Sequence, residues 1–507
     1  MTLTGKNLIA GEWCGNTENG FSAFHAVNNE PMAQTFADAT EQEVEQAIQR
    51  AHSAFSSYGK LPANERAKFL RTIGEEILAL GDDLVEIASA ETGLPSVRIQ
   101  GERGRTVGQL GLFADLLENG EYQPVIDTAN PERQPLPKPD TRLGYLPLGV
   151  VSVFAASNFP LAFSTAGGDT ASALAAGCPV VMKAHAAHPG TAELVARAIE
   201  KAIQKCGIDA GVFSLIQGKN YAIATQLVTH PLVQAVGFTG SERVGMILQA
   251  QINERPSPIP FYGELGSVNP QFVLPSKLAQ EGEPLAQALV ASLMMGQGQF
   301  CTSPGIWALV DSEEYSVFAE SAANAIAETE AGVMLTPGIA NSYKRAVNQW
   351  KTIEDVRLLA EGRPGVEHFC QAALFETSYE TFAKTPELQE EVFGSCALIV
   401  KCRDESELNA LIVGLKGNLT ASIHAASDDL SLAQSVAQLA VHKVGRLIYN
   451  QMPTGVEVCA SMNHGGPFPA STDVRTTSVG SEAIKRFQRP ICYQNMPQEL
   501  LPELLKG

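Results

Sequence analysis

The sequence predicts an α/β protein that is built from mostly parallel sheets and divided into more than one lobe. From about residue 148 onward, short apolar β-type runs alternate with helical stretches, as in strands joined by crossover helices. The chain has 507 residues, too many for one compact core. Its 45% hydrophobic and 18% charged residues are typical of a globular protein. We therefore expect at least two α/β lobes, each with its own core.

The first elements that the sequence predicts are helices. Thr40 and Glu43 make a capping box ahead of an apolar stripe that runs from Val44 to Phe55. A longer amphipathic pattern follows, and we expect its apolar residues to face one way along a helix. These residues are Phe69, Leu70, Ile73, Ile77, Leu78, Leu84 and Ile87.

Two runs of alternating strands and helices come next. The first run has apolar strands at residues 150–154, 179–183, 213–218 and 233–241, with helical stretches between them. The second run, from roughly residue 270 to 450, predicts another lobe with strands near residues 270–275, 305–311 and 395–402. Parallel sheets of this kind bind ligands at the carboxyl ends of their strands. The Pro-rich stretch 123–147 predicts an extended excursion away from the core.

Composition and charge exclude several classes of partner. Residues 148–168 carry no charge, but an Asn-Phe-Pro break and a Gly-Gly pair favour a buried strand and helix over a membrane span. The net charge of −19 is spread along the chain, which argues against nucleic acid or an anionic membrane as a partner. The nine cysteines form no CxxC pair, and the N-terminal residues contain no secretory cleavage site. We expect a cytoplasmic protein that acts on a small molecule.

Two short motifs are ambiguous when taken alone. FTGSERVG, residues 238–245, ends a predicted strand and begins a predicted helix, so the amides of Gly240 and Gly245 can face a dinucleotide. The motif lacks the full GxGxxG spacing, and a purely structural turn stays open. Cys301 lies in GQGQFCTSPG among small and polar residues. Most free cysteines are small buried hydrophobes, so this context alone does not make Cys301 a nucleophile.

Several motifs along almost the whole chain resemble those of the aldehyde dehydrogenase superfamily. The most specific are YGELGSVNP at residues 262–270 and GQGQFCTSPG at residues 296–305. NLIAGEW, SNFPLAF, PVVMKAHAAHPGT, GFTGSERVG, EEVFGS and RTTSVGSEAIKRFQRP occur in the order that the family has them.

The resemblance implies a domain division. A Rossmann-type dinucleotide-binding domain is expected in residues 1–129 and 148–265, and a catalytic domain in residues 266–475. Oligomerisation strands and a tail are expected in residues 130–147 and 476–507, whose exposed edges another subunit would cover. A homodimer or homotetramer follows from the same resemblance.

The resemblance assigns the chemistry to three side chains. Cys301 matches the nucleophile, whose thiolate adds to the aldehyde carbon so that hydride can leave and then forms a thioester that water cleaves. Glu264 matches the base that activates Cys301 or the deacylating water, and we expect its apolar setting to raise its pKa toward neutral. Asn158 matches the amide that holds the oxyanion together with the backbone N–H of Cys301. A base at position 264 favours hydrolysis to the free acid over transfer to coenzyme A.

The resemblance also implies a nicotinamide cofactor. Lys183 matches the lysine that binds ribose hydroxyls, and Glu391 matches the carboxylate that binds the nicotinamide ribose, with Phe393 beside the ring. Glu390 is the register-shifted alternative to Glu391. Four further positions are expected at the cofactor: Gly218, Gly240, Ser241 and Gly245.

One departure from the family pattern bears on the cofactor. Many NAD-preferring relatives have a carboxylate three residues after the lysine, where this chain has Ala186. Without that charge a 2′-phosphate is tolerated, so we expect NADP to be preferred and NAD to be possible. His185 is expected near the 2′-phosphate. Because His185 and His188 have no third ligand partner in the sequence, we predict no metal there.

Other departures indicate a branch of the family. Ser267 and Ser395 replace a glycine and a proline that are usual in the family. With residues 450–471, they resemble the branch that contains 2-oxoglutarate semialdehyde dehydrogenases and an NADP-dependent long-chain aldehyde dehydrogenase. A helix over residues 100–117 offers candidates to bind a second substrate carboxylate, although a solvated helix face explains them equally well. The candidate substrate residues are Arg103, Arg105, Gln109, Phe159, Phe300 and Thr302.

The expected activity is therefore NAD(P)-dependent oxidation of an aldehyde to a carboxylic acid. The preferred substrate is 2-oxoglutarate semialdehyde, and a medium or long aliphatic aldehyde is the alternative. A non-catalytic protein of the same fold and a thioesterase that uses Cys301 and Glu264 without cofactor are the alternatives from other classes.

Overall fold

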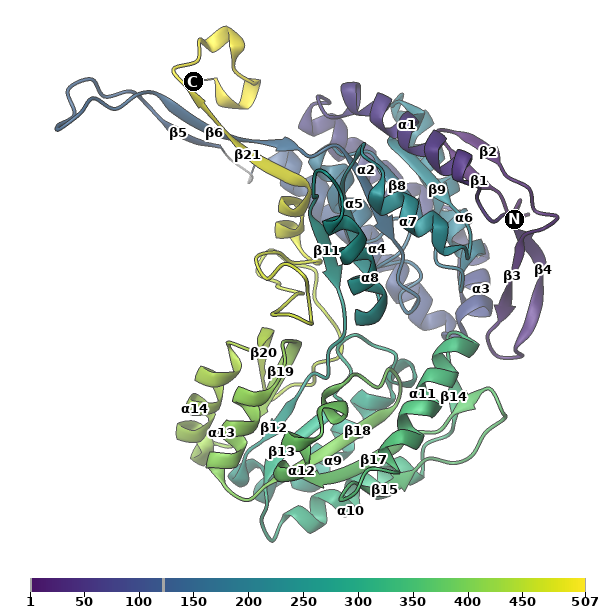
Figure 1. Ribbon diagram of the computed structural model, residues 1–507, viewed down its shortest axis with the longest axis vertical. Helices are drawn as coiled ribbons and strands as arrows, with labels where there is room; N and C mark the ends of the chain where they lie inside the picture. Colours follow the sequence, from purple (N-terminus) through teal and green to yellow (C-terminus); the bar gives the residue numbers. More distant parts are fainter. Residues whose placement is uncertain (1, 121–123, 507) are drawn as a thin grey trace.

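Two α/β lobes and a projecting β arm make up the computed structural model, which describes residues 2–120 and 124–506 (Figure 1). Three parts of the predicted organisation lie outside the described residues: residue 1, residues 121–123, of which 123 begins the Pro-rich stretch, and residue 507 at the end of the predicted tail. The mostly parallel sheets that the alternating pattern predicts are confirmed. The domain boundaries given above remain a prediction.

A seven-stranded sheet forms the centre of the first lobe. Its long strands are parallel, and two short N-terminal strands extend it in antiparallel fashion. In sheet order these are β11 (Phe261–Glu264), β10 (Val233–Thr239), β7 (Val150–Phe154), β8 (Val180–Lys183), β9 (Phe213–Ile216), β1 (Asn7–Ile9) and β2 (Glu12–Cys14). Strands β8 and β9 follow β7 on one side, and the chain then returns to place β10 and β11 on the other side of β7. The point between β7 and β10, where the strand order reverses, is the kind of switch point at which such sheets bind nucleotides.

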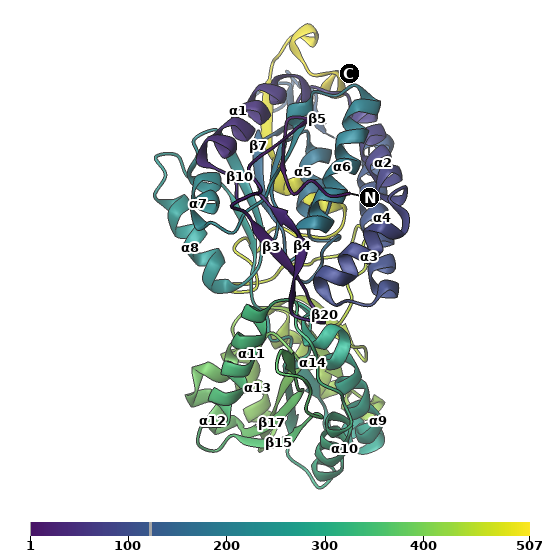
Figure 2. The same ribbon diagram turned by 90° about the vertical axis from the view of Figure 1, so that its right-hand side faces the viewer.

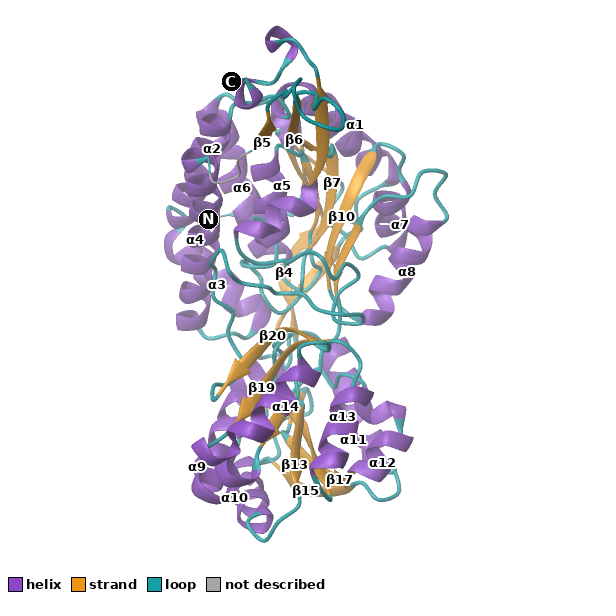
Figure 3. Cartoon of the chain, turned by 90° about the vertical axis from the view of Figure 1, so that its left-hand side faces the viewer, coloured by secondary structure: helices purple, strands orange, loops and turns teal. Residues whose placement is uncertain are grey.

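Helices cover both faces of this sheet (Figure 3). One face packs against α1 (Glu41–Tyr58), α7 (Tyr221–Thr229) and α8 (Glu242–Asn253). The other face packs against α2 (Ala63–Leu78), α3 (Gly81–Thr92), α4 (Ser96–Asn119), α5 (Gly168–Ala176) and α6 (Pro189–Cys206). The predicted capping box is present at the start of α1, where the Thr40 and Glu43 side chains each accept from the other's backbone N–H.

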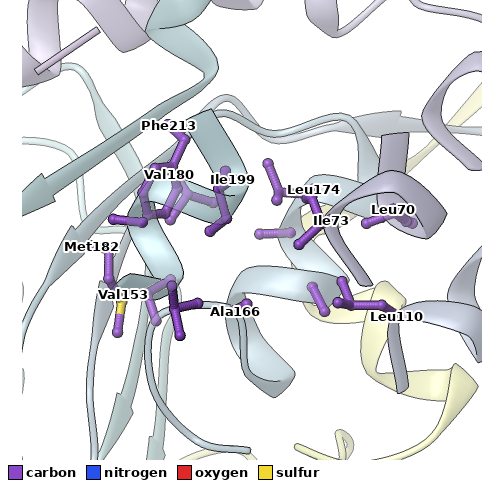
Figure 4. Packing of buried hydrophobic residues seen from close by; sticks show 14 of the residues in the cluster. Leu70, Ile73, Leu110, Val153, Ala166, Leu174, Val180, Met182, Ile199 and Phe213 are labelled. Atoms are coloured by element: carbon purple, nitrogen blue, oxygen red, sulfur yellow. The ribbon is translucent and has the colours of Figure 1, made fainter. Parts of the chain in front are cut away.

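The core between the sheet and the second set of helices is continuous (Figure 4). Leu70 and Ile73 of α2 and Leu110 of α4 share it with Val180 and Phe213 of the sheet. Burying each of these side chains contributes about 1.5–3 kcal/mol. This packing makes α4, which carries the candidate substrate residues Arg103, Arg105 and Gln109, a rigid element of the lobe.

The long amphipathic pattern after α1 is two helices and not one. The break falls between α2 and α3, where Gly81 adopts a φ of +58° and turns the chain. Leu78, at the end of α2, is 50% exposed, so the prediction that it faces the core with its neighbours is wrong. The stripe alone could not reveal the break because both helices bury apolar residues in the same core.

A second seven-stranded sheet forms the other lobe (Figure 2). Its strands are parallel except for β15 at one edge. In sheet order they are β15 (Arg357–Glu361), β17 (Ala373–Ser378), β18 (Cys396–Cys402), β13 (Ile306–Val310), β12 (Gln271–Val273), β19 (Asn418–His424) and β20 (Val444–Tyr449). One face packs against α9 (Pro275–Met294) and α10 (Tyr315–Ala327), and the other against α11 (Pro337–Trp350), α12 (Tyr379–Lys384), α13 (Glu405–Gly414) and α14 (Leu430–Ala440).

Smaller sheets complete the fold. The Pro-rich excursion forms an arm of β5 (Val125–Asp127), β6 (Thr141–Pro147) and the C-terminal β21 (Gln488–Gln494), which projects from the first lobe (Figure 1). Two short pairs are β3 (Phe21–His25) with β4 (Glu30–Phe36), and β14 (Gly332–Val333) with β16 (Phe369–Cys370). Within the described residues, no helix is both long and apolar enough to cross a membrane. The uncharged stretch at residues 148–168 contains strand β7 and turns, as the breaks in it predict.

Candidate active site

Cys301 lies on a tightly turned loop, residues 295–305, which we call the nucleophile loop. Gly296, Gln297 and Gly298 in this loop have φ values of +56°, +56° and +66°. A Cβ atom on Gly298 would lie 2.2 Å from the carbonyl carbon of Gly394, so the close approach of these two segments requires glycine. The glycines that surround Cys301 in the sequence therefore serve to shape its loop.

Asn269 fixes the backbone of the nucleophile loop. Its Nδ2 donates to the carbonyl oxygens of Cys301 and Ser303, at 2.9 Å each. Its Oδ1 accepts hydrogen bonds from the hydroxyls of Ser267 (2.8 Å) and Thr420 (2.9 Å). The serine that replaces the usual glycine at position 267 thus belongs to the network that holds the nucleophile. The hydroxyl of Ser395, the other unusual serine, has no partner among the described residues.

The predicted nucleophile and base are joined by a histidine that the sequence analysis did not single out. The Sγ of Cys301 lies 3.5 Å from the Nε2 of His464, and that nitrogen lies 3.1 Å from the Oε1 of Glu264. The hydroxyl of Ser478 donates to the other oxygen of Glu264 at 2.7 Å. His464 and Glu264 are buried, whereas Cys301 is half-buried. Both contacts fall on the same ring nitrogen, so the thiol and the carboxylate converge on Nε2 of His464, and a neutral imidazole can accept the thiol proton there.

His464 reaches this position because its segment returns to the first lobe after β20. The Leu265 N–H donates to the carbonyl of Ala470, and the Thr472 N–H donates to the carbonyl of Gly263, which binds this segment to the end of β11. The predicted segment 450–471 contains His464. Nothing in the periodicity of that segment marks the histidine, because the contact joins residues far apart in sequence.

The electrostatics of the site separate the roles of its groups. Burial raises the pKa of the Cys301 thiol well above its ordinary value, and the negative charges of Glu264 and Glu391 raise it further. Burial by itself raises the pKa of Glu264 as well. The charge and hydrogen bond of His464, together with the hydroxyl of Ser478, outweigh that effect and leave the pKa below its usual range. The prediction of a raised Glu264 pKa is therefore wrong, because the contacts of His464 and Ser478 favour the charged carboxylate.

Asn158, the predicted oxyanion group, borders the nucleophile loop. Its Nδ2 donates to the carbonyl of Gln299 at 3.0 Å, two residues before Cys301. An amide nitrogen carries two N–H donors, so the second one is available to an oxygen bound at the site. Asn158 follows β7, at the carboxyl edge of the parallel strands.

One stripe of α4 faces an aromatic wall beside Cys301. The stripe consists of residues at helical spacing: Arg98, Glu102, Arg105 and Gln109. The guanidinium of Arg98 lies 4.6 Å from the ring centroids of both Phe159 and Phe300. The guanidinium of Arg105 lies 5.1 Å from the ring of Phe163, which in turn lies 6.0 Å from the ring of His464.

Within this stripe, the Nε2 of Gln109 is buried without a partner among the described residues, and Arg105 has still more free hydrogen-bonding capacity. Both of its Nη atoms are buried without a hydrogen-bond partner among the described residues. Burial lowers its pKa, whereas the charges of Cys301, Glu102 and Glu264 raise it. An unpaired buried guanidinium is costly, which favours a ligand that pairs with it.

The other candidate substrate residues differ in position. Arg103 lies off the stripe and donates to the carbonyl of Gly81 at 2.8 Å, so the structure does not bring it to Cys301. Gln109 is buried close to Gly168, at the start of α5. Thr302 is 1% exposed, and its hydroxyl has no partner among the described residues. Phe159 and Phe300 contact each other edge to face at 5.3 Å and form the aromatic wall with Phe163.

A cleft between the lobes has the size and position for a dinucleotide. Its cavity of about 500 Å³ is lined by Ser241, Gly266, Asn418 and both Glu390 and Glu391. Ser241 caps α8 by accepting from the Val244 N–H. Gly245 packs so closely on Leu265 that a Cβ atom would lie 2.3 Å from that side chain. Phe393 packs against the core of the first lobe.

Lys183 lies at the carboxyl end of β8, on the nucleotide edge of the sheet. Its Nζ donates to the carbonyls of Gly218 (2.6 Å) and Ala184 (2.8 Å). Burial lowers the pKa of Lys183 to about 8, although Asp38 opposes the shift. Gly218, two residues beyond β9, thus lies beside Lys183, and the binding of the cofactor by these two residues stays a prediction.

The two histidines after Lys183 stack on each other at 5.6 Å. The Nε2 of His188 lies 2.8 Å from the carbonyl of Ala156 and donates to it. Burial lowers the pKa of His185 to about 3, with His188 and Lys183 adding to the shift. His185 is thus neutral at physiological pH, and His188 already uses one of its nitrogens, which does not favour a metal pair.

The site combines a nucleotide-sized cleft with a cysteine that lies beside an imidazole and a carboxylate. These features define an enzyme that uses a thiol nucleophile beside a dinucleotide. Residues 13–488 match the model of the aldehyde dehydrogenase family. The chain belongs to this family and is an NAD(P)-dependent aldehyde dehydrogenase.

Two curated relatives match essentially the whole chain. Alpha-ketoglutaric semialdehyde dehydrogenase 2 of Azospirillum brasilense is 49% identical, over 100% of this chain and 97% of the relative. Alpha-ketoglutaric semialdehyde dehydrogenase of Acinetobacter baylyi is 46% identical, over 99% of this chain and 96% of the relative. A structure of betaine aldehyde dehydrogenase from Staphylococcus aureus with NAD+ superposes with a TM-score of 0.83 at 21% identity, covering 98% of both chains. That likeness establishes the fold alone.

Proposed function

We propose that the protein oxidises 2-oxoglutarate semialdehyde to 2-oxoglutarate. The observation that carries this choice is Arg105, whose buried guanidinium has no partner among the described residues and lies beside the aromatic wall near Cys301. A carboxylate at the far end of the substrate pairs with this guanidinium and offsets the cost of burying its charge. The names of the two relatives at 46% and 49% identity support the same substrate.

The mechanism that this geometry supports begins at Cys301. His464 accepts the thiol proton, and Glu264 stabilises the resulting imidazolium at 3.1 Å. The thiolate adds to the aldehyde carbon, while the Asn158 amide and the Cys301 N–H donate to the oxyanion. After the thioester has formed, His464 releases the thiol proton to solvent. Neutral again, it withdraws a proton from the water that cleaves the thioester and releases the acid.

The cofactor contributes one part of this chemistry: its nicotinamide ring, when bound, accepts the hydride that leaves the tetrahedral carbon. Glu391 and Ser241, which line the cleft, and other predicted cofactor residues outside its lining fit such a group. Lys183 and Gly218 would hold the adenine ribose, and Glu391 the nicotinamide ribose, with Phe393 beside the ring. Ser241 and Gly240 offer the N-terminus of α8 to the pyrophosphate.

Replacing Arg105 with methionine tests the substrate assignment. We expect kcat/KM for 2-oxoglutarate semialdehyde to fall about 100-fold, because the substrate carboxylate loses a buried partner. Activity toward pentanal, which has no carboxylate, is expected to stay within about threefold. Arg103→Met is the matched control on the same helix and should change neither value. Equal losses on both aldehydes would mean that Arg105 only supports the fold.

The alternative substrate is a medium or long aliphatic aldehyde, which the rings of Phe159, Phe163 and Phe300 favour. A comparison of kcat/KM for the wild-type protein separates the two. If an aliphatic aldehyde of six to ten carbons is used as well as 2-oxoglutarate semialdehyde or better, the alternative holds. A protein without turnover, or a thioesterase, would produce no reduced cofactor from any aldehyde.

For the cofactor we propose a preference for NADP over NAD, with Ala186 as its basis. Introducing a carboxylate by Ala186→Glu is expected to lower kcat/KM for NADP about 100-fold through repulsion of the 2′-phosphate. NAD should lose much less, because the new carboxylate can accept from its ribose hydroxyls. Ala186→Gln, which has the same size without the charge, serves as the control. If both substitutions lower NADP use equally, the effect is steric.

The lowered pKa of Lys183 predicts a pH dependence of cofactor binding. With a pKa of about 8, the amine of the free protein is charged below pH 8 and neutral above it. The Kd for NADP is therefore expected to rise between pH 7.5 and 9.5, with a proton taken up on binding in that range. Calorimetry in buffers of different ionisation enthalpy measures this uptake. Lys183→Met should show weak binding and no proton uptake, and uptake that persists in this variant would assign the proton to another group.

The arm and the thiols support two further proposals. Leu136 and Val125 of the arm are 69% and 56% exposed, and we propose that another subunit covers this arm in a homodimer or homotetramer. All nine cysteines are free thiols, which fits a reducing cytoplasm.

A further inference from the structure

Glu264, Cys301 and His464 together have the composition of a zinc site. Each offers one ligand atom, and these atoms all lie within 4.8 Å of one another. The three donors are a sulfur, a nitrogen and a carboxylate oxygen, which are the donors that Zn²⁺ takes in proteins. Three protein ligands leave a fourth tetrahedral position open to water.

Two of the three spacings between these atoms are close to what a bound ion requires, and the third, between the Cys301 sulfur and the Glu264 oxygen, is within 4.8 Å. A tetrahedral Zn²⁺ with bonds of about 2.0–2.3 Å holds its ligand atoms about 3.3–3.7 Å apart. The Cys301 sulfur and His464 Nε2 are 3.5 Å apart, and the same nitrogen and Glu264 Oε1 are 3.1 Å apart. Small movements of the side chains are enough to admit the ion.

The surroundings hold these ligands in place. Ser478 donates to the Glu264 oxygen that faces away from His464, and Asn269 donates to the carbonyl of Cys301. Such supporting hydrogen bonds strengthen metal binding because they orient the ligands in advance. A thiolate and a carboxylate also neutralise the two charges of Zn²⁺, so the ion can be buried with a neutral imidazole.

We propose that this triad binds one Zn²⁺ ion and that the bound ion switches the enzyme off. On binding, the Cys301 thiol releases its proton and its sulfur bonds to the metal. The sulfur lone pair and the His464 nitrogen are then both engaged, so neither the nucleophile nor its base is available to an aldehyde. Mg²⁺ and Ca²⁺ prefer six or more oxygen ligands and do not fit this donor set. The inference does not depend on which aldehyde is the substrate.

The test uses the full-length protein, freed of metal and reduced, in a titration with Zn²⁺ against a chromophoric chelator. We expect one tight equivalent in the wild type and binding at least about 100-fold weaker in His464→Gln. Cys492→Ser, which removes an exposed thiol on the arm, is the control and should keep the tight equivalent. Thermal unfolding of each variant confirms that it is folded. A tight equivalent that survives in His464→Gln would lie elsewhere and would overturn the proposal.

Cobalt supplies a readout that does not involve activity. Co²⁺ in this site should give a sulfur-to-cobalt charge-transfer band together with the visible bands of a tetrahedral ion, and the charge-transfer band should be absent in Cys301→Ser. Zn²⁺ should also protect Cys301 from iodoacetamide and inhibit the dehydrogenase in proportion to occupancy, with recovery in EDTA and no effect of Mg²⁺. A charge-transfer band that persists in Cys301→Ser, or inhibition without protection of Cys301, contradicts the site.

Discussion

Cys301→Ala is expected to lower aldehyde-dependent reduction of NADP at least about 10⁴-fold, because no other group can form the covalent intermediate. The sulfur of Cys301 makes the aldehyde carbon tetrahedral by adding to it. This sulfur lies 3.5 Å from the Nε2 of His464, which takes the thiol proton. Steady-state assays with 2-oxoglutarate semialdehyde and with pentanal measure the loss, which should be the same for both aldehydes.

Cofactor binding provides the control for this loss. Cys301 is half-buried in its loop, and alanine fits there without strain, so the Kd for NADP should stay within about threefold of the wild type. Cys459→Ala, at another half-buried thiol, should leave activity unchanged. Dehydrogenase activity retained in Cys301→Ala would remove the assignment of the nucleophile altogether.

The second large effect is expected at His464. His464→Gln should slow formation of the thioester about 10²–10⁴-fold at pH 7, the contribution typical of a general base. The reason is the pKa of Cys301, which burial raises well above its ordinary value, so that few thiolates form without a base. Because a raised thiol pKa is overcome by alkali, the rate of the variant should climb steeply with pH. The wild-type rate should level off at a lower pH.

Single-turnover kinetics separate this role from a structural one. The burst of reduced cofactor reports thioester formation, and alkylation of Cys301 by iodoacetamide reports the thiolate directly. Both should slow in His464→Gln at pH 7 and recover together at high pH. Glu264→Gln is expected to have a smaller effect on the burst than His464→Gln, since the carboxylate acts on the thiol through the imidazole. A pH-independent defect in His464→Gln would instead indicate a distorted loop.

The fold and the central residues of the site could be predicted from the sequence because their signals are local. Strands such as Val150–Phe154 and Val180–Lys183 are continuous apolar runs, and buried parallel strands produce such runs. Cys301, Glu264 and Asn158 lie in short motifs that resemble those of a family. In the structure Asn158 donates to the loop that carries Cys301, and Glu264 lies near Cys301 through His464.

What could not be predicted depends on contacts between distant segments. His464 is recognisable as a site residue only from its contact with Glu264, which is distant in sequence. No pattern within residues 450–471 predicts that contact. The prediction that the pKa of Glu264 is raised was wrong for the same reason. Its apolar neighbours in the sequence indicated desolvation, but they did not indicate the contact with the imidazole of His464. On α4, the sequence could not show which arginine lies near Cys301. The structure shows that the face of the helix that carries Arg105, and not Arg103, packs beside the aromatic wall.

The crossing of the His464 segment has a consequence for how the enzyme is made. The nucleophile and the oxyanion amide are synthesised well before residues 464–478, which pair with the end of β11 and supply both the imidazole and the hydroxyl that holds Glu264. A growing chain on the ribosome therefore contains Cys301 without its proton acceptor. The site becomes competent to oxidise an aldehyde only after residues 464–478 have emerged and folded against β11, so chains truncated before them lack the imidazole that takes the thiol proton.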